Sequence, residues 1–125
     1  FQDHNLIDYL TPEENLRLVN PKADMKILED LGLSREESKR NIMHLSGGQR
    51  QRVAVGRALV APGRAILADE PTGSLDPEMT DEVIDLLRHA AHQLGKCVIV
   101  VTHSKRVADS ADAVYTLRHK KLAKA

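Results

Sequence analysis

Two apolar segments of the sequence lead directly to side chains that can do chemistry. The segment Ala65–Ala68 is followed by Asp69 and Glu70. A second segment, Val98–Val101, leads through one threonine to His103. A carboxylate at the end of a strand can hold magnesium, and its neighbour can polarise or deprotonate an attacking water. Because ligands bind beyond the carboxyl ends of parallel strands, both ends are candidate sites.

A third candidate is the stretch Ser46, Gly47, Gly48 and Gln49. Its spacing is that of a capping box, which begins a helix. A helix start offers unpaired N–H groups and the positive end of the dipole to an anion, and glycines let a phosphate approach the backbone. An ordinary helix cap is the alternative. Two adjacent glycines inside a helix cost about 1 kcal/mol each, and a helix start that faces a ligand avoids most of that penalty.

The second half of the chain alternates strands and helices. The two apolar segments predict strands buried on both faces, and Cys97 is expected to be a small buried hydrophobe. A helix runs from Asp76-Pro77 to Gly95, and residues 113–117 predict a third strand. Strand, helix, strand in succession indicates an α/β class with a parallel sheet and crossover helices.

The first 45 residues predict short helices and no strand. Capping boxes begin helices at Thr11 and Ser34, and Asn20-Pro21 opens another that Gly32 ends. The sequence therefore predicts a small helical region joined to part of an α/β sheet.

Composition restricts the function classes. The 125 residues suffice for one ordinary domain. Lys plus Arg and Asp plus Glu number 18 each, and only three residues are aromatic, so nucleic-acid binding is not expected. No apolar run approaches the roughly 20 residues that span a bilayer. The lone cysteine and the lack of a signal peptide predict a cytoplasmic location.

Taken together, five segments resemble the motifs of ABC ATPases in family order. The surroundings are most similar to the exporter-type branch that handles lipoproteins, macrolides and antimicrobial peptides. The matches are Phe1-Gln2 with the Q-loop, residues 45–49 (LSGGQ) with the signature, residues 66–72 (ILADEPT) with Walker B, residues 74–76 (SLD) with the D-loop, and His103 with the switch histidine.

The resemblance implies a fold and a division of the chain. It implies a partial P-loop NTPase, with a RecA-like parallel sheet and crossover helices, plus a small all-helical signature subdomain. Residues 1–61 would form that helical subdomain from the Q-loop to the signature helix, and residues 62–125 the C-terminal part of the ATPase core.

The resemblance also implies roles and partners. In this family ATP and magnesium are sandwiched between two such domains, so a homodimer is expected. The dimer would bind transmembrane permease subunits at the inner face of the cell membrane. ATP hydrolysis would power transport, with export favoured. By this resemblance Glu70 would act on the attacking water, His103 would contact the γ-phosphate, and Asp69 and Gln2 would bind magnesium. The nucleotide bound to the partner would be contacted by Ser46, Gly47, Gly48 and Gln49. Asp76 would act across the dimer interface, and Gln2 would also couple the site to the permease.

One family motif is absent from the 125 residues. No G-x-x-x-x-G-K-[ST] phosphate loop occurs, and by family order it would precede Phe1, so the chain is expected to be the C-terminal half of a nucleotide-binding domain. Losing even three charge-assisted hydrogen bonds would weaken nucleotide binding by at least about a thousandfold. The chain alone is therefore predicted not to hydrolyse ATP.

Two alternatives to this function remain open. A truncated, non-catalytic module could present a signature surface to a complete ABC partner. An ABC ATPase of DNA repair is disfavoured by the neutral charge and the exporter-like Q-loop surroundings. Among the weaker features, His89 and His92 are expected to lie on a solvated helix face, and His119-Lys120-Lys121 makes a final hairpin doubtful because it lacks a glycine-bearing turn.

Overall fold

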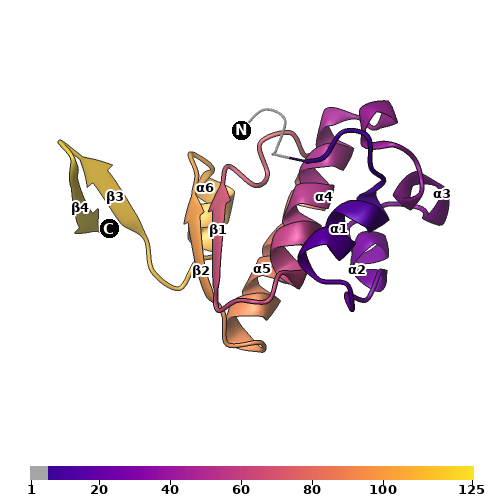
Figure 1. The fold of residues 1–125 in the computed structure, drawn as a ribbon. Coiled ribbons are helices and arrows are strands. Elements are labelled where there is room, and N and C mark those ends of the chain that lie inside the picture. The colour runs from indigo at the N-terminus through magenta and orange to yellow at the C-terminus, as the bar shows by residue number, and fades with distance from the viewer. Residues whose placement is uncertain (1–5) are drawn as a thin grey trace.

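The computed structural model describes residues 6–125, so Phe1 and Gln2 lie outside the described part of the chain. Helices gather on one side of a small parallel sheet, and a hairpin stands apart at the C-terminal end (Figure 1). The elements in chain order are α1 (Pro12–Val19), α2 (Lys26–Asp30), α3 (Arg35–Ser38), the 3₁₀ helix η1 (Ile42–His44), α4 (Gly47–Val60), β1 (Ala65–Asp69), α5 (Pro77–His92), β2 (Cys97–Val101), α6 (Lys105–Asp109), β3 (Tyr115–Arg118) and β4 (Lys121–Lys124).

Helix starts follow the predicted capping chemistry. Thr11, Ser34 and Ser46 each cap a helix through a complete reciprocal capping box. The predicted start at Asn20-Pro21 is wrong, because α2 begins only at Lys26. The Asn20 side chain instead accepts from the Lys22 N–H (3.0 Å) and donates to the Val60 carbonyl (2.9 Å), which keeps this stretch in a turn.

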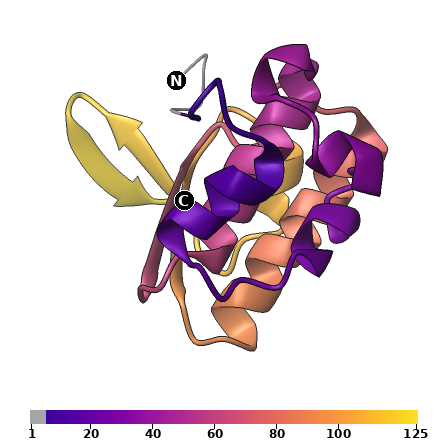
Figure 2. The same ribbon diagram turned by 45° about the vertical axis from the view of Figure 1, so that its right-hand side comes forward.

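Strands β1 and β2 pair in parallel, with Ala65 opposite Cys97 and Asp69 opposite Val101, and α5 provides the crossover between them. Figure 2 shows the helices gathered on one side of these strands. The side chains that face them include Ile66, which is buried. On the opposite face Leu67 is 75% exposed. The prediction that these two strands are buried on both faces is therefore wrong within the described residues.

Cys97 is exposed for the same reason. It lies opposite Ala65 on the uncovered face of the sheet, because side chains alternate between the two faces of a strand. The prediction of a buried thiol is therefore wrong within residues 6–125.

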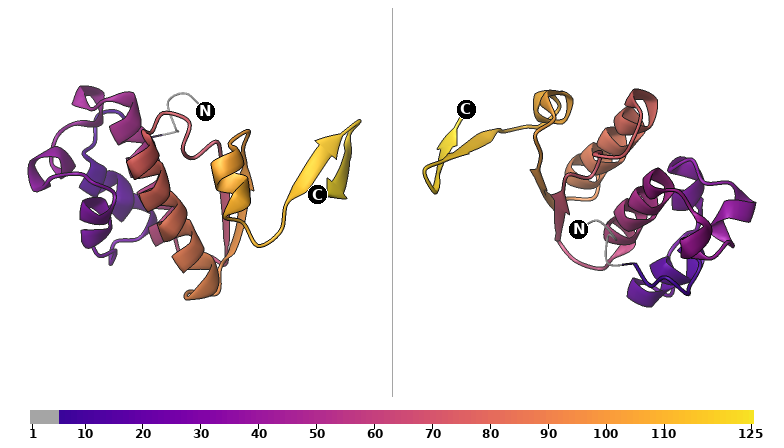
Figure 3. Two further views of the ribbon diagram at one scale, coloured as in Figure 1. Left: turned by 180° about the vertical axis from the view of Figure 1, so that it is seen from behind. Right: turned by 90° about the horizontal axis from the view of Figure 1, so that it is seen from above.

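The C-terminal strands form a hairpin that is separate from the parallel sheet. β3 pairs antiparallel with β4, with Leu117 opposite Leu122, so the predicted third parallel strand is wrong. The doubt about a final hairpin is also wrong. His119 and Lys120 make the two-residue turn at φ 50° and 63°, the left-handed pair that a type I′ turn requires even without glycine. Both views in Figure 3 show the hairpin projecting from the body.

The described core lies mainly between α1, α2 and α4. Leu16, Leu31 and Val53 are fully buried there, and each buried aliphatic side chain contributes about 1.5–3 kcal/mol relative to an exposed one. Gly56 allows the close packing, because a Cβ atom at that position would lie 3.0 Å from Leu31 Cδ1. The long helix α4 is thus packed closely against its neighbours.

A buried asparagine fixes the entry to this helical region. Asn15 is 0% exposed and its side chain exchanges hydrogen bonds with the Ile7 backbone, accepting from N–H at 2.9 Å and donating to the carbonyl at 3.3 Å. It also donates to the Thr11 carbonyl at 3.0 Å. The side chain therefore fastens residues 7–11 to α1.

We expect Asn15→Leu to lower the free energy of unfolding by about 1–3 kcal/mol, because the Ile7 groups lose their partner while they stay partly buried. Urea unfolding followed by circular dichroism measures the change. Gln93→Leu, at the exposed C-cap position that follows α5, is the control and should change stability little. Equal effects of the two substitutions would contradict this account of Asn15.

An ion pair and a histidine–carboxylate hydrogen bond fasten α6 and the residues after it to α5. Arg106 donates to Asp81 through Nε (2.7 Å) and Nη2 (2.9 Å), and His92 Nε2 lies 2.8 Å from Asp112 Oδ2. His92 therefore lies on an exposed surface, as predicted, but has a partner there. The hydrogen bond from Arg106 lowers the pKa of Asp81, and that from His92 lowers the pKa of Asp112.

A pH dependence of stability follows from these two lowered pKa values. A carboxyl group whose folded pKa is depressed adds stability above its ordinary pKa of about 4, and that stability is lost as the pH falls through the folded value. We therefore expect the urea midpoint to fall between about pH 5 and pH 3, and to fall less in an Asp81→Asn, Asp112→Asn double variant. Identical acid profiles for the two proteins would show that these pairs do not contribute.

Candidate functional site

The carboxyl ends of β1 and β2 lie side by side. Asp69 is opposite Val101 in the register, and the next backbone N–H, that of Glu70, donates to the Val101 carbonyl at 2.7 Å. The structure therefore brings Asp69, Glu70 and His103 to one edge of the sheet, as the sequence predicts.

Glu70 is held by the residues that follow β2. Its Oε2 accepts from the Thr102 hydroxyl at 3.1 Å, and its Oε1 accepts from the His103 backbone N–H at 2.8 Å. The Ser104 N–H donates to the same Thr102 hydroxyl at 2.9 Å, which directs the hydroxyl hydrogen toward Glu70. The side chain of Glu70 remains 37% exposed, so it is fixed in place and still open to a water molecule.

His103 presents its imidazole to solvent. The ring is fully exposed, and its Nε2 lies 4.0 Å from Glu70 Oε1. A side chain in this position can reach a ligand that approaches the sheet edge from outside. The histidine and the glutamate are therefore close enough to act on the same ligand.

Asp69 fits a magnesium ion that brings its own phosphate and water ligands. Its carboxylate is exposed at the end of β1. Within residues 6–125, no group of three or more His, Cys, Asp or Glu could enclose a metal. Magnesium commonly takes only one or two carboxylates and completes its shell with water and substrate phosphates. Gln2, the other predicted ligand, lies outside the described residues.

The turn at residues 46–49, called here the signature turn, begins α4. Ser46 Oγ accepts from the Gln49 N–H at 3.1 Å, while Gln49 Oε1 accepts from the Ser46 N–H at 2.8 Å. A Cβ atom at Gly47 would meet nothing within 4 Å, so its backbone is open to an approaching group. The first N–H groups of a helix have no intrahelical partner, and the open turn therefore suits an anion.

Gln49 is engaged with the protein. Besides the bond to Ser46, its Nε2 donates to Glu37 Oε2, which ties the signature turn to the cap of α3. The Ser34 backbone N–H donates a hydrogen bond to the Glu37 carboxylate, and this bond is the main reason why the pKa of Glu37 lies below its usual range. The capping bonds between Gln49 and Ser46 follow the predicted pattern, whereas the bond from Gln49 to Glu37 is a contact that the sequence does not reveal.

Residues 70–76, called here the linking loop, join the sheet edge to α5 and run against the signature turn. A Cβ atom at Gly48 would lie 3.1 Å from the Ser74 carbonyl oxygen. At the end of the loop Asp76 caps α5 by accepting from the Met79 N–H at 2.8 Å. The linking loop therefore begins at the sheet edge and packs against the signature turn, so it connects the two candidate sites.

A residue that the sequence analysis missed connects these parts. Gln51 is buried in α4, donates to the Glu70 carbonyl at 2.7 Å and accepts from the Ser74 N–H at 2.8 Å. Thr102 belongs to the polar strand end that the sequence indicates, but the sequence does not predict its hydrogen bond to Glu70. No sequence pattern marks these contacts, because glutamine in a helix and threonine after a strand are ordinary on exposed surfaces.

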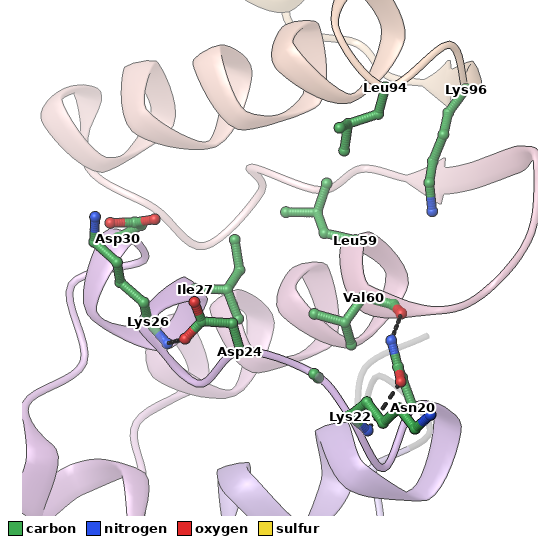
Figure 4. A pocket seen from close by; sticks show the side chains of 11 residues that line it. Asn20, Lys22, Asp24, Lys26, Ile27, Asp30, Leu59, Val60, Leu94 and Lys96 are labelled. Carbon is green, nitrogen blue, oxygen red and sulfur yellow. Dashed lines mark hydrogen bonds between the residues drawn. The ribbon is translucent and has the colours of Figure 1, made fainter.

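A groove of about 450 Å³ lies at the other end of α4, between its last turn and the region of α2 (Figure 4). Asn20 donates to the Val60 carbonyl there, and Lys96 Nζ donates to the Ala61 carbonyl at 2.9 Å. These bonds satisfy the end of α4. Because a 14-residue helix is about 20 Å long, the groove is remote from the signature turn.

Among the described residues, no helix combines the length and apolar character needed to cross a membrane.

Comparison with known proteins places these features in a family. The ABC transporter family model matches residues 1–73. The lipoprotein-releasing system ATP-binding protein LolD of Rickettsia prowazekii is 42% identical over 95% of this chain and 58% of its own length. The macrolide export ATP-binding/permease protein MacB of Brucella melitensis is 42% identical over 94% of this chain and 20% of its own length.

A solved structure agrees with these relatives. The ATP-binding cassette MJ0796, in a dimeric post-hydrolysis state bound to ADP and Pi, superposes with a TM-score of 0.85 at 33% identity, over 99% of this chain and 60% of that one. The match supports the α/β cassette fold predicted from the sequence. The chain spans a little over half the length of LolD. It belongs to the ABC transporter family, as part of an ATP-binding cassette related to those of LolD and MacB.

Proposed function

We propose that this chain supplies the signature and the hydrolytic edge of a cassette that hydrolyses ATP to power transport. The observation that carries the proposal is the position of Glu70, fixed by Thr102 and the His103 backbone at the joined ends of β1 and β2. A carboxylate that is fixed yet reachable by water is suited to act as a base. The names of LolD and MacB favour export.

Within this cassette each candidate residue has a proposed role. Asp69 holds the magnesium of ATP, and Gln2 serves the same ion and couples the site to the permease. Glu70 takes a proton from the attacking water, while His103 contacts the γ-phosphate. Ser46, Gly47 and Gly48 receive the γ-phosphate of a nucleotide bound to a second cassette, Gln49 shapes that turn, and Asp76 acts across the dimer. The open surroundings of Gly47 support the role proposed for Ser46, Gly47 and Gly48.

The division of the chain is likewise a proposal. Residues 1–61 form the helical signature subdomain and residues 62–125 a part of the ATPase core. Parallel sheets are normally covered on both faces, so the exposed face of β1 and β2 supports a larger core completed by further residues. The 125 residues contain no phosphate-loop motif, and we propose that they do not hydrolyse ATP without one.

The proposed partners are a second cassette and permease subunits. The dimeric state of MJ0796 supports the first, and the combined ATP-binding and permease name of MacB supports the second. The protein would then lie on the cytoplasmic face of a membrane, held there by the permease.

The experiment that tests the proposed function adds a phosphate-loop motif to the chain. The 125 residues are joined behind the phosphate-loop segment of R. prowazekii LolD, giving what is called here the completed cassette. We expect it to release phosphate from ATP, and we expect the chain alone and a completed cassette with the loop lysine changed to alanine to release none. A folded completed cassette without activity would contradict the proposal and favour a non-catalytic module that only presents its signature turn.

A further inference from the structure

The side chain of Gln51 links the two candidate sites within one chain. It is 4% exposed, and both ends of its amide are used: Nε2 donates to the Glu70 carbonyl at 2.7 Å, and Oε1 accepts from the Ser74 N–H at 2.8 Å. Gln51 belongs to α4, whereas Glu70 and Ser74 belong to the linking loop. One side chain therefore bonds the signature helix to two points of the linking loop, its first residue and Ser74.

The backbone that Gln51 holds is strained. Glu70 has φ of 48°, in the left-handed region that residues other than glycine adopt at a cost of about 1–3 kcal/mol. Such a conformation persists only when its surroundings enforce it. Here the Glu70 carbonyl accepts from Gln51 and also from the Gly73 N–H at 3.2 Å, while the Glu70 N–H is bonded to Val101. Gln51 thus provides the side-chain part of that enforcement.

Backbone strain at Glu70 sets the direction of its carboxylate. With this φ the side chain points to the end of β2 and accepts from Thr102 and the His103 N–H. On the other side, the linking loop lies against the signature turn, where Gly48 leaves 3.1 Å between its Cβ position and the Ser74 carbonyl. The signature turn and the linking loop are therefore joined both by direct contact at Gly48 and Ser74 and by the Gln51 amide.

We propose that Gln51 is a positioning residue that fixes the Glu70 backbone and the Ser74 amide relative to the signature helix. This inference rests on the proposed function, in which the signature turn serves one nucleotide and Glu70 the other. Gln51 then couples the two nucleotide sites of a dimer: closure of the signature turn on one ATP sets the base at the second. Gln51 itself touches neither nucleotide.

The first test uses the 125-residue chain and does not depend on ATP. Gln51→Leu removes both hydrogen bonds at similar size, and Gln51→Glu keeps an acceptor for the Ser74 N–H. We expect Gln51→Leu to raise the hydrogen-exchange rate of the Ser74 amide by about tenfold, with little change at Val53 and Val83 in the core, and Gln51→Glu, which keeps only the acceptor, to restore part of the protection. Unchanged Ser74 exchange in Gln51→Leu would overturn the inference.

The second test measures ATP hydrolysis by the completed cassette. We expect Gln51→Leu to lower kcat by about tenfold or more with a KM for ATP within about twofold of wild type, because a misplaced base slows the chemical step without removing phosphate contacts. Gln93→Leu, on exposed surface, is the matched control and should leave both unchanged. A wild-type kcat in Gln51→Leu would overturn the inference, whereas an inactive wild-type cassette would instead contradict the proposed function.

Discussion

Glu70→Gln in the completed cassette is expected to reduce ATP turnover by about 10²–10⁴-fold, the usual contribution of a general base, while ATP binding stays intact. Glutamine keeps the shape of the side chain and an oxygen that can still accept from the His103 N–H. Its amide nitrogen can donate to Thr102, whose hydroxyl already accepts from Ser104. The fold at the sheet edge should therefore survive, and only the ability to take a proton is lost.

Steady-state phosphate release measures the expected loss of turnover, and calorimetric titration of Mg-ATP measures whether ATP binding stays intact. Glu82→Gln, on the exposed face of α5, is the control and should hydrolyse ATP normally. Turnover close to wild type in Glu70→Gln would remove Glu70 from the mechanism. Loss of ATP binding in the same variant would instead indicate that the substitution disturbs the site.

Gly47→Arg is expected to weaken ATP-dependent dimerisation of the completed cassette by about a hundredfold or more, because a large side chain would fill the space left open for the partner's nucleotide. Apart from the adjacent residues and the nearby backbone of α4 itself, no atom lies within 4 Å of the Cβ position at Gly47, so the chain should fold normally. ATP binding within the substituted chain should persist, since the phosphate loop is on the same subunit.

Gly63→Arg is the matched control for this substitution. A Cβ atom at Gly63 also meets nothing within 4 Å, but Gly63 lies after α4 and away from the signature turn. Both variants are compared by sedimentation in the Glu70→Gln background, where ATP is not consumed. Equal dimerisation of the two would contradict the role of the signature turn.

Local signals in the sequence predict the fold where the chemistry is local. The capping box at Ser46 and Gln49 forms as expected, because its partners are three residues apart and need no tertiary help. The same is true of the left-handed Gly32, with φ of 80°, which ends α2. The meeting of Glu70 and His103 follows from the topology, since neighbouring parallel strands end at one edge.

Non-local contacts account for what the sequence does not predict. Gln51 gains its role only because the linking loop returns to α4, a contact between residues 19 and 23 positions apart. β3 has the composition of a sheet strand but finds its partner in the adjacent β4. Leu67 is apolar yet exposed because the helices of the described chain cover one face of the sheet.

Calorimetric titration of Mg-ATP into the 125-residue chain and into the completed cassette tests the central claim most directly. The account predicts no detectable binding to the chain alone and saturable micromolar binding to the completed cassette, because the signature turn and the Glu70 edge serve a nucleotide that a phosphate loop must hold. Micromolar binding to the chain alone would contradict it, since these residues would then form a nucleotide site without that loop.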